Sequence, residues 1–187
     1  MRLSEREKVE LLHIARTRIR SLLDNTPDPP IHVSNSLAIP CGAFVTLRLD
    51  GELRGCVGYV EPRLPLDRTV AEVSAKSAFD DPRFPPLTIE EFRRTEIEIS
   101  VLTPLRRVEN PQSIEVGVHG VVIECGIRRG LLLPQVAEEF GWDRDQLLSH
   151  TCLKAGLPPD AWKSPGVGIY CFSAEKFSES EFSAKAI

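Results

Sequence analysis

The first part of the chain carries the pattern of an amphipathic helix. Apolar residues recur at helical spacing over 11–23, and Ser4 with Glu7 forms the S-x-x-E pattern that caps the start of a helix. Prolines within 27–30 then stop it, because proline lacks the amide donor and disfavours helical geometry in the residue before it. The sequence therefore predicts a helix over 4–24.

The pattern then changes to that of a β-hairpin. From Ala43 onward apolar and polar positions alternate, which is the period of a strand. Asp50 and Gly51 are a residue pair typical of a tight turn between antiparallel strands, and residues 52–60 return as the second strand. A hairpin over 43–60 is expected.

The rest of the chain mixes short helical and strand patterns. Thr88 with Glu91 repeats the capping pattern, and Pro134 suits the first turn of a helix. The expected elements are a helix over 66–79, a short helix after Thr88, a strand over 95–102, short strands over 114–118, 121–125 and 131–133, helices over 134–141 and 143–155, and a last strand over 167–172.

These elements do not follow the regular strand-helix-strand order of a parallel sheet. Hairpin connections dominate, which favours a two-layer α+β fold with mostly antiparallel sheets covered by helices. The 4–24 helix should pack over one sheet face. The proline-bounded stretch 104–111 is the candidate boundary between two lobes.

Composition narrows the possible partners. The chain has 187 residues, of which 42% are hydrophobic and 27% charged, with a formal charge of −4, so an ordinary globular protein is expected. Its arginine pairs are scattered at 93–94, 106–107 and 128–129, which does not fit the basic footprint that nucleic acid requires. The charged first ten residues and the absence of a long apolar run predict a cytoplasmic protein without a membrane span.

Cofactor motifs are missing. The sequence contains no phosphate-cradling GxxxxGK[ST] loop, no GxGxxG after a strand, no HExxH and no CxxxCxxC, so we expect no nucleotide or iron–sulfur cofactor in this chain. Its five cysteines lack CxxC spacing and are expected to be reduced thiols. Apolar surroundings predict burial of Cys125, Cys152 and Cys171.

The segment 53–58 is the most informative. On a regular strand Arg54 and Cys56 share one face, so the guanidinium could stabilise a thiolate, while Gly55 and Gly58 would admit a ligand or a second backbone. The alternative is a small buried cysteine with glycines that allow tight packing or a bulge.

Two further segments have a functional and a structural interpretation. Asp81 and Arg83, held among prolines, either present polar groups for binding or only turn the chain. His119 before a glycine is either a general base or ligand, or a turn residue. A metal site built from Cys56, His119 and Cys125 lacks local ligand spacing, so no metal is expected.

Taken together, the motifs resemble those of the AMMECR-type domain family, whose prokaryotic members are called AmmeMemoRadiSam system protein A. The match runs in order over about residues 40–172. It consists of FVTL at 44–47, LRGCVG at 53–58, DPRFPPL at 81–87, EIEISVL at 96–102, HG at 119–120, GLLLPQVA at 130–137 and KAGLP at 154–158.

The resemblance implies a single domain over 1–187 with two associated lobes and the RGCxG strand near the cleft between them. It also implies partners, a Memo-like protein and a radical S-adenosylmethionine protein, but no established reaction. Tyr59 stands where the family pattern more often has a small hydroxyl residue.

Two functions then compete. The first is an accessory component that binds a small substrate or modified chain in that cleft. The alternative is an enzyme with Cys56 as nucleophile, Arg54 as its electrostatic partner and His119 or Asp81 moving protons.

Overall fold

The computed structural model describes residues 3–30 and 33–182, and the chain divides into two compact units. Unit 1 comprises the chain up to Leu102 and from Glu175 onward, whereas unit 2 comprises Thr103–Ala174. The chain therefore passes between the units twice. The stretch 104–111, expected from the sequence as a boundary, lies just inside unit 2.

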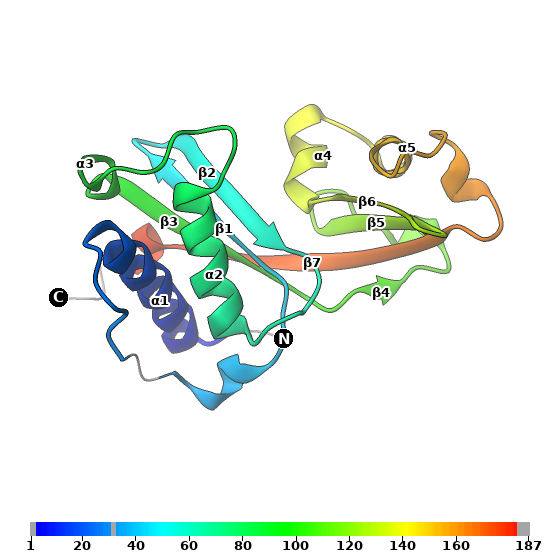
Figure 1. Ribbon diagram of the computed structural model, residues 1–187. Helices are drawn as coiled ribbons and strands as arrows, with labels where there is room; N and C mark the ends of the chain where they lie inside the picture. The colour runs from blue at the N-terminus through cyan, green and yellow to red at the C-terminus, as the bar shows by residue number, and fades with distance from the viewer. Residues whose placement is uncertain (1–2, 31–32, 183–187) are drawn as a thin grey trace. The chain divides into compact units, whose positions relative to one another are not determined.

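Unit 1 is a helix-covered antiparallel sheet. Its strands follow the order β2-β1-β3-β7, and β1 pairs antiparallel with both β2 and β3. Figure 1 shows α1 and α2 side by side on one face of this sheet. The elements are α1 (Glu5–Leu23), a 3-10 helix (Asn35–Ala38), β1 (Ala43–Leu49), β2 (Glu52–Tyr59), α2 (Leu66–Phe79), α3 (Ile89–Phe92), β3 (Thr95–Leu102), the last part of β7 (Gly168–Ser178) and a 3-10 helix (Glu179–Glu181).

The sequence patterns explain these elements. The Ser4–Glu7 capping box starts α1, and the turn at Asp50 and Gly51 has positive φ at both residues, as tight hairpins require. The apolar side chains of the helices and those on the inner face of the sheet pack together in one hydrophobic core. That core includes Leu11, Ala15, Ile19, Val45, Leu47, Val70, Val73, Ile97, Ile99 and Phe177, all of them fully buried.

Unit 2 contains further antiparallel strand pairs and its own core. The strand β5 pairs with β6 on one side and with β7 on the other, while the short β4 pairs with β7. The elements are β4 (Arg106–Arg107), a 3-10 helix (Pro111–Ser113), β5 (His119–Cys125), β6 (Arg128–Leu132), α4 (Pro134–Phe140), α5 (Arg144–Lys154), a 3-10 helix (Ala161–Lys163) and the first part of β7. The expected antiparallel α+β fold is confirmed.

Two expectations for strands were wrong in detail. Residues 114–118 form a loop, because Gly117 turns the chain at φ +82° and only Ile114 is anchored in the core, whereas Val118 is exposed. The last strand continues beyond residue 172 to Ser178. Its charged residues in the second half obscured the apolar pattern, although Phe177 is fully buried in unit 1.

Among the described residues, no helix combines the length and the apolar character that crossing a membrane requires.

Candidate functional site

The surroundings of Cys56 begin with an unusually close approach of α2 to the hairpin. A Cβ on Gly55 would lie 2.1 Å from the carbonyl oxygen of Ser77, so only glycine fits at this position. The Ser77 hydroxyl donates to the Val45 carbonyl at 2.8 Å and accepts from the Val57 amide at 2.9 Å. It therefore bridges β1 and β2. Of the two roles considered for Gly55, the structure shows the close approach of a second backbone.

The backbone of Cys56 is held by a carboxylate and a guanidinium. Asp81 Oδ2 accepts a hydrogen bond from the Cys56 amide at 2.8 Å, and Arg83 Nη2 donates to the Cys56 carbonyl at 3.1 Å. The strand β2 is the edge of its sheet, so these two side chains satisfy backbone groups that a neighbouring strand would otherwise pair. We call Cys56, Asp81 and Arg83 the Cys56 cluster.

A tight turn brings the cluster together. The Phe84 amide donates to the Asp81 carbonyl at 3.1 Å, with Pro82 at the position that its fixed φ suits. The Asp81 carboxylate also accepts from the Arg83 amide at 3.1 Å and from Arg83 Nε at 2.9 Å and Nη2 at 2.6 Å. Asp81 therefore both turns the chain and organises the cluster.

The Asp81 carboxylate is fixed in its ionised form. Its side chain is only 3% exposed, and the Arg83 guanidinium, helped by the backbone amides of Cys56 and Arg83, holds its pKa well below the usual range. A carboxylate of this kind stays deprotonated near neutral pH. It is therefore unsuited to the proton transfer that the enzyme hypothesis assigned to it.

Arg54 is turned toward Glu91, not toward Cys56. Its Nε and Nη2 donate to the two Glu91 oxygens at 3.0 Å each, and Nη2 also donates to the Pro85 carbonyl at 2.9 Å. The expected alternation fails because a bulge interrupts the strand: Leu47 pairs with Gly55, but Arg48 pairs with Leu53, leaving Arg54 unpaired. Arg83, rather than Arg54, is the guanidinium beside Cys56.

The thiol faces the neighbouring strand. Thr46 is directly opposite Cys56, and its hydroxyl donates to the sulfur at 3.3 Å. Cys56 is half-buried. Gly58 lies two residues after Cys56 on β2. A Cβ on Gly58 would lie 2.3 Å from Cγ of the Phe44 ring. Gly58 thus accommodates an aromatic ring instead of leaving space beside the sulfur.

His119 belongs to unit 2, at the start of β5. Its Nδ1 accepts from the Glu115 amide at 3.0 Å, and its own amide donates to the Glu115 carbonyl at 2.9 Å. A Cβ on the following Gly120 would lie 2.3 Å from the Phe172 ring. The hydrogen bonds with Glu115 close a turn, whereas the contact at Gly120 shows close packing. Within 3–30 and 33–182, no group of three or more His, Cys, Asp or Glu side chains could hold a metal ion.

The other cysteines differ in exposure. Cys41, Cys152 and Cys171 are buried, as expected for the last two, but Cys125 is half-buried at the end of β5, where its strand meets solvent. Burial raises the pKa of the Cys41 and Cys152 thiols.

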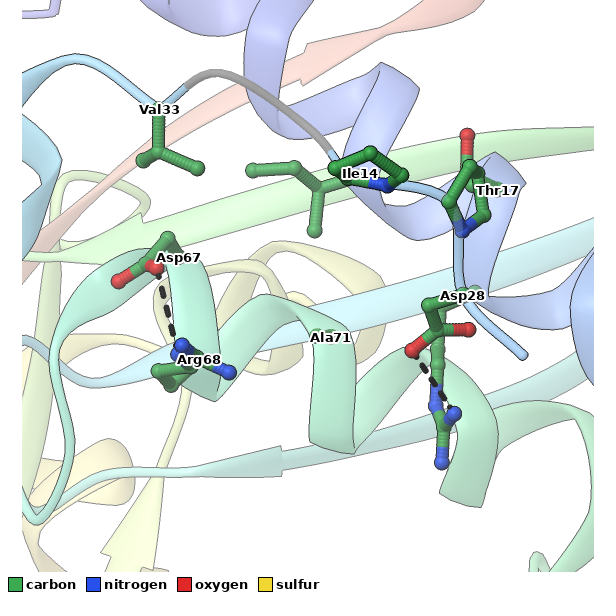
Figure 2. Close-up of a pocket in the computed structure, with 10 residues that line it drawn as sticks. Ile14, Thr17, Asp28, Val33, Asp67, Arg68 and Ala71 are labelled. Atoms are coloured by element: carbon green, nitrogen blue, oxygen red, sulfur yellow. Dashed lines mark hydrogen bonds and ion pairs between the residues drawn. The ribbon is translucent and has the colours of Figure 1, made fainter.

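A cavity of about 300 Å³ lies elsewhere in unit 1, between α1, α2, residues 28–30 and Val33 (Figure 2). The charged side chains that line this cavity form ion pairs with one another. Arg18 Nη1 lies 2.9 Å from Asp28 Oδ2, and Arg68 Nε lies 3.6 Å from Asp67 Oδ2. None of its lining residues belongs to the Cys56 cluster.

Glu91 is the participant that sequence reasoning missed. The sequence indicates Glu91 only as the capping partner of Thr88, and in the structure its carboxylate accepts a hydrogen bond from the Thr88 amide at 3.0 Å. The same carboxylate binds Arg54, which is 37 residues away along the chain. The capping pattern marks Glu91 as carboxylate-bearing at a helix start, but no local signal links it to Arg54.

Acid should weaken unit 1 through Glu91. Its hydrogen bonds with Arg54 lower the pKa of Glu91 from 4.5 to about 2. Because this folded-state pKa is depressed, the stabilisation is complete above about pH 4.5 and is lost as the pH falls toward 2, by about 2 kcal/mol after allowance for solvent screening. Urea unfolding at a series of acidic pH values measures the loss. If the free energy of unfolding depended on pH in the same way in Glu91→Gln, this assignment would be contradicted.

Comparison with known proteins identifies the family. The AMMECR1 family model matches residues 12–177. Protein MK0488 of Methanopyrus kandleri is 46% identical over 184 residues, covering 91% of this chain and 87% of its own, and Protein MJ0810 of Methanocaldococcus jannaschii is 49% identical over 148 residues, covering 75% and 74%. The crystal structure of the uncharacterized protein PH0010 from Pyrococcus horikoshii superposes with a TM-score of 0.84 at 40% identity, covering 95% of this chain and 93% of that one. With most of its length matched in sequence and in structure, the chain belongs to the AMMECR1 family.

Proposed function

We propose that this protein is an accessory component that works with a Memo-like protein and a radical S-adenosylmethionine protein in the cytoplasm. In this role it binds a small substrate or a modified chain on the surface formed by the Cys56 cluster. The proposal favours binding over catalysis by the chain itself.

One observation carries this preference. The cluster offers a half-buried thiol and an exposed guanidinium, but its carboxylate is locked in an ion pair with Arg83. A nucleophilic thiol is activated by a neighbouring base or positive charge, and turnover also needs a base that can take and return a proton. Asp81 is not such a base, because its pKa lies well below the usual range. The groups of the cluster are those of a recognition surface.

Co-purification tests the proposal. The chain is co-expressed with its Memo-like and radical S-adenosylmethionine partners, and small molecules released from the isolated complex are measured by mass spectrometry. Wild type and Cys56→Ser should both recover the partners and retain the bound molecule, whereas Arg83→Gln should lose most of the molecule. Recovery of neither partner would overturn the accessory role. Product formation that disappears only in Cys56→Ser would instead establish the nucleophile.

The exposure of Cys56 gives a separate prediction. Iodoacetamide, a neutral reagent, should modify Cys56 in the native protein well before the buried Cys41, Cys152 and Cys171, because reaction requires access to the sulfur. Peptide mapping at increasing reaction times measures the order. Modification of Cys56 only after unfolding would remove the thiol from the proposed binding surface.

A further inference from the structure

Arg83 is a guanidinium held in place with part of its donor capacity unused. The Asp81 carboxylate accepts hydrogen bonds from Arg83 Nε and Nη2, and the Cys56 carbonyl accepts a further hydrogen bond from Nη2. Within the described part of the chain, Nη1 makes no hydrogen bond to a protein oxygen, and the guanidinium also interacts with the Cys56 side chain. The Arg83 side chain is 52% exposed, so solvent reaches it.

This arrangement prepares the guanidinium for a ligand. A free arginine side chain loses much rotamer freedom when it binds, which reduces the affinity gained. Here Asp81 has already fixed the orientation of Arg83 through two parallel hydrogen bonds. The side chain has therefore lost most of its conformational entropy on folding, before any ligand binds.

The exposed side of the cluster is cationic although its formal charges balance. The Asp81 side chain is 3% exposed against 52% for Arg83, so a ligand meets the guanidinium and not the carboxylate. The Phe84 ring lies beside both guanidinium groups: the guanidinium carbons of Arg83 and Arg54 are 5.6 and 5.7 Å from the ring centroid. Arg54 Nη1 is buried and has no hydrogen-bond partner among the described residues.

We infer that the ligand recognised at the Cys56 cluster carries an anionic group that binds Arg83 Nη1 next to the Cys56 sulfur. The inference rests on the proposed function and adds the chemical class of the ligand. A carboxylate or a phosphate group would satisfy the unused donors.

Two alkylating reagents that differ in charge test this inference. Iodoacetate carries a carboxylate and iodoacetamide is its neutral analogue, and with both the Cys56 thiolate displaces iodide. The ratio of the two rate constants at Cys56 is compared with the same ratio for N-acetylcysteinamide, a free neutral thiol. We expect the Cys56 ratio to be about fivefold higher, the effect of one close favourable charge in water. Protection by acetate or by inorganic phosphate, tested separately, identifies which anion the site prefers.

Variants assign the effect to Arg83. Arg83→Gln should lower the ratio to that of the free thiol or below it, because the Asp81 carboxylate is then unpaired, whereas Arg83→Lys, which keeps the charge, should retain most of the increase. Arg68→Gln removes the same charge at the opposite end of α2 and should leave the ratio unchanged. The half-buried Cys125 in unit 2 provides an internal thiol whose ratio should not respond to Arg83→Gln.

The two proposals fail in different ways. Rapid modification of Cys56 by both reagents, with the ratio of the free thiol, would overturn the anionic ligand and leave the binding surface intact. Resistance of Cys56 to both reagents would overturn the binding surface itself. An increased ratio that persists in folded Arg83→Gln protein would also refute the role of Arg83.

Discussion

Replacing Gly55 with alanine is expected to lower the free energy of unfolding by about 3 kcal/mol, the upper part of the range for overpacked positions. The added Cβ would lie 2.1 Å from the Ser77 carbonyl oxygen, and a backbone atom cannot move aside as a flexible side chain can. The end of α2 would have to retreat. That movement would break the bridge that the Ser77 hydroxyl makes between Val45 and Val57.

Urea unfolding measures this loss, and Gly51→Ala is the matched control in the same hairpin. Gly51 has no atom within 4 Å of the added Cβ, so its substitution introduces only the strain of a positive φ, about 1 kcal/mol. Hydrogen exchange provides a local readout, since amides near the end of α2, such as that of Asp80, should lose protection in Gly55→Ala. Equal losses in the two variants would show that α2 does not depend on the close approach.

Replacing Glu91 with glutamine should destabilise the protein by about 3 kcal/mol at neutral pH, because it leaves the buried Arg54 charge uncompensated. The Arg54 side chain is 8% exposed and the Glu91 side chain 29% exposed, so solvent replaces the lost carboxylate poorly. Glutamine can still accept from the Thr88 amide, so the capping box is retained and the loss reports the ion pair.

The control for this variant is Glu90→Ala, an exposed position on the same short helix that should change stability by less than about 0.5 kcal/mol. The double variant Arg54→Met with Glu91→Gln should recover much of the loss, since it removes the unpaired charge as well as its partner. Additive losses in the double variant would mean that the two side chains do not stabilise each other.

Most elements of this protein were predictable because their signals are local. The capping boxes at Ser4 and Thr88 mark two helix starts, and both are present in the structure. The Asp50–Gly51 turn fixes the hairpin, since few residues other than glycine, asparagine and aspartate accept positive φ there. The spacing of the apolar residues then decides which face of each helix or strand is buried. These features depend on residues within a few positions of one another.

The continuation of β7 beyond residue 172 is a different case, because it depends on where distant parts of the chain meet. Phe177 is fully buried in the core of unit 1, but its neighbours along the strand include the charged Glu175 and Lys176. The pairing of β7 with β3 supplies backbone hydrogen bonds that outweigh the weak local pattern. Strand propensity alone therefore ended this element too early.

The sequence alone singled out the residues of the Cys56 cluster, since the RGCxG and DPRF motifs contain the thiol, the carboxylate and the guanidinium. Only the tertiary structure decided how they pair: Asp81 meets Cys56 across 25 residues and Glu91 meets Arg54 across 37. The bulge at Arg54 broke the alternation on which its expected direction depended. Residue type and local spacing are written in the sequence, but the partner of a buried charge is set by which loops the fold brings together to compensate it.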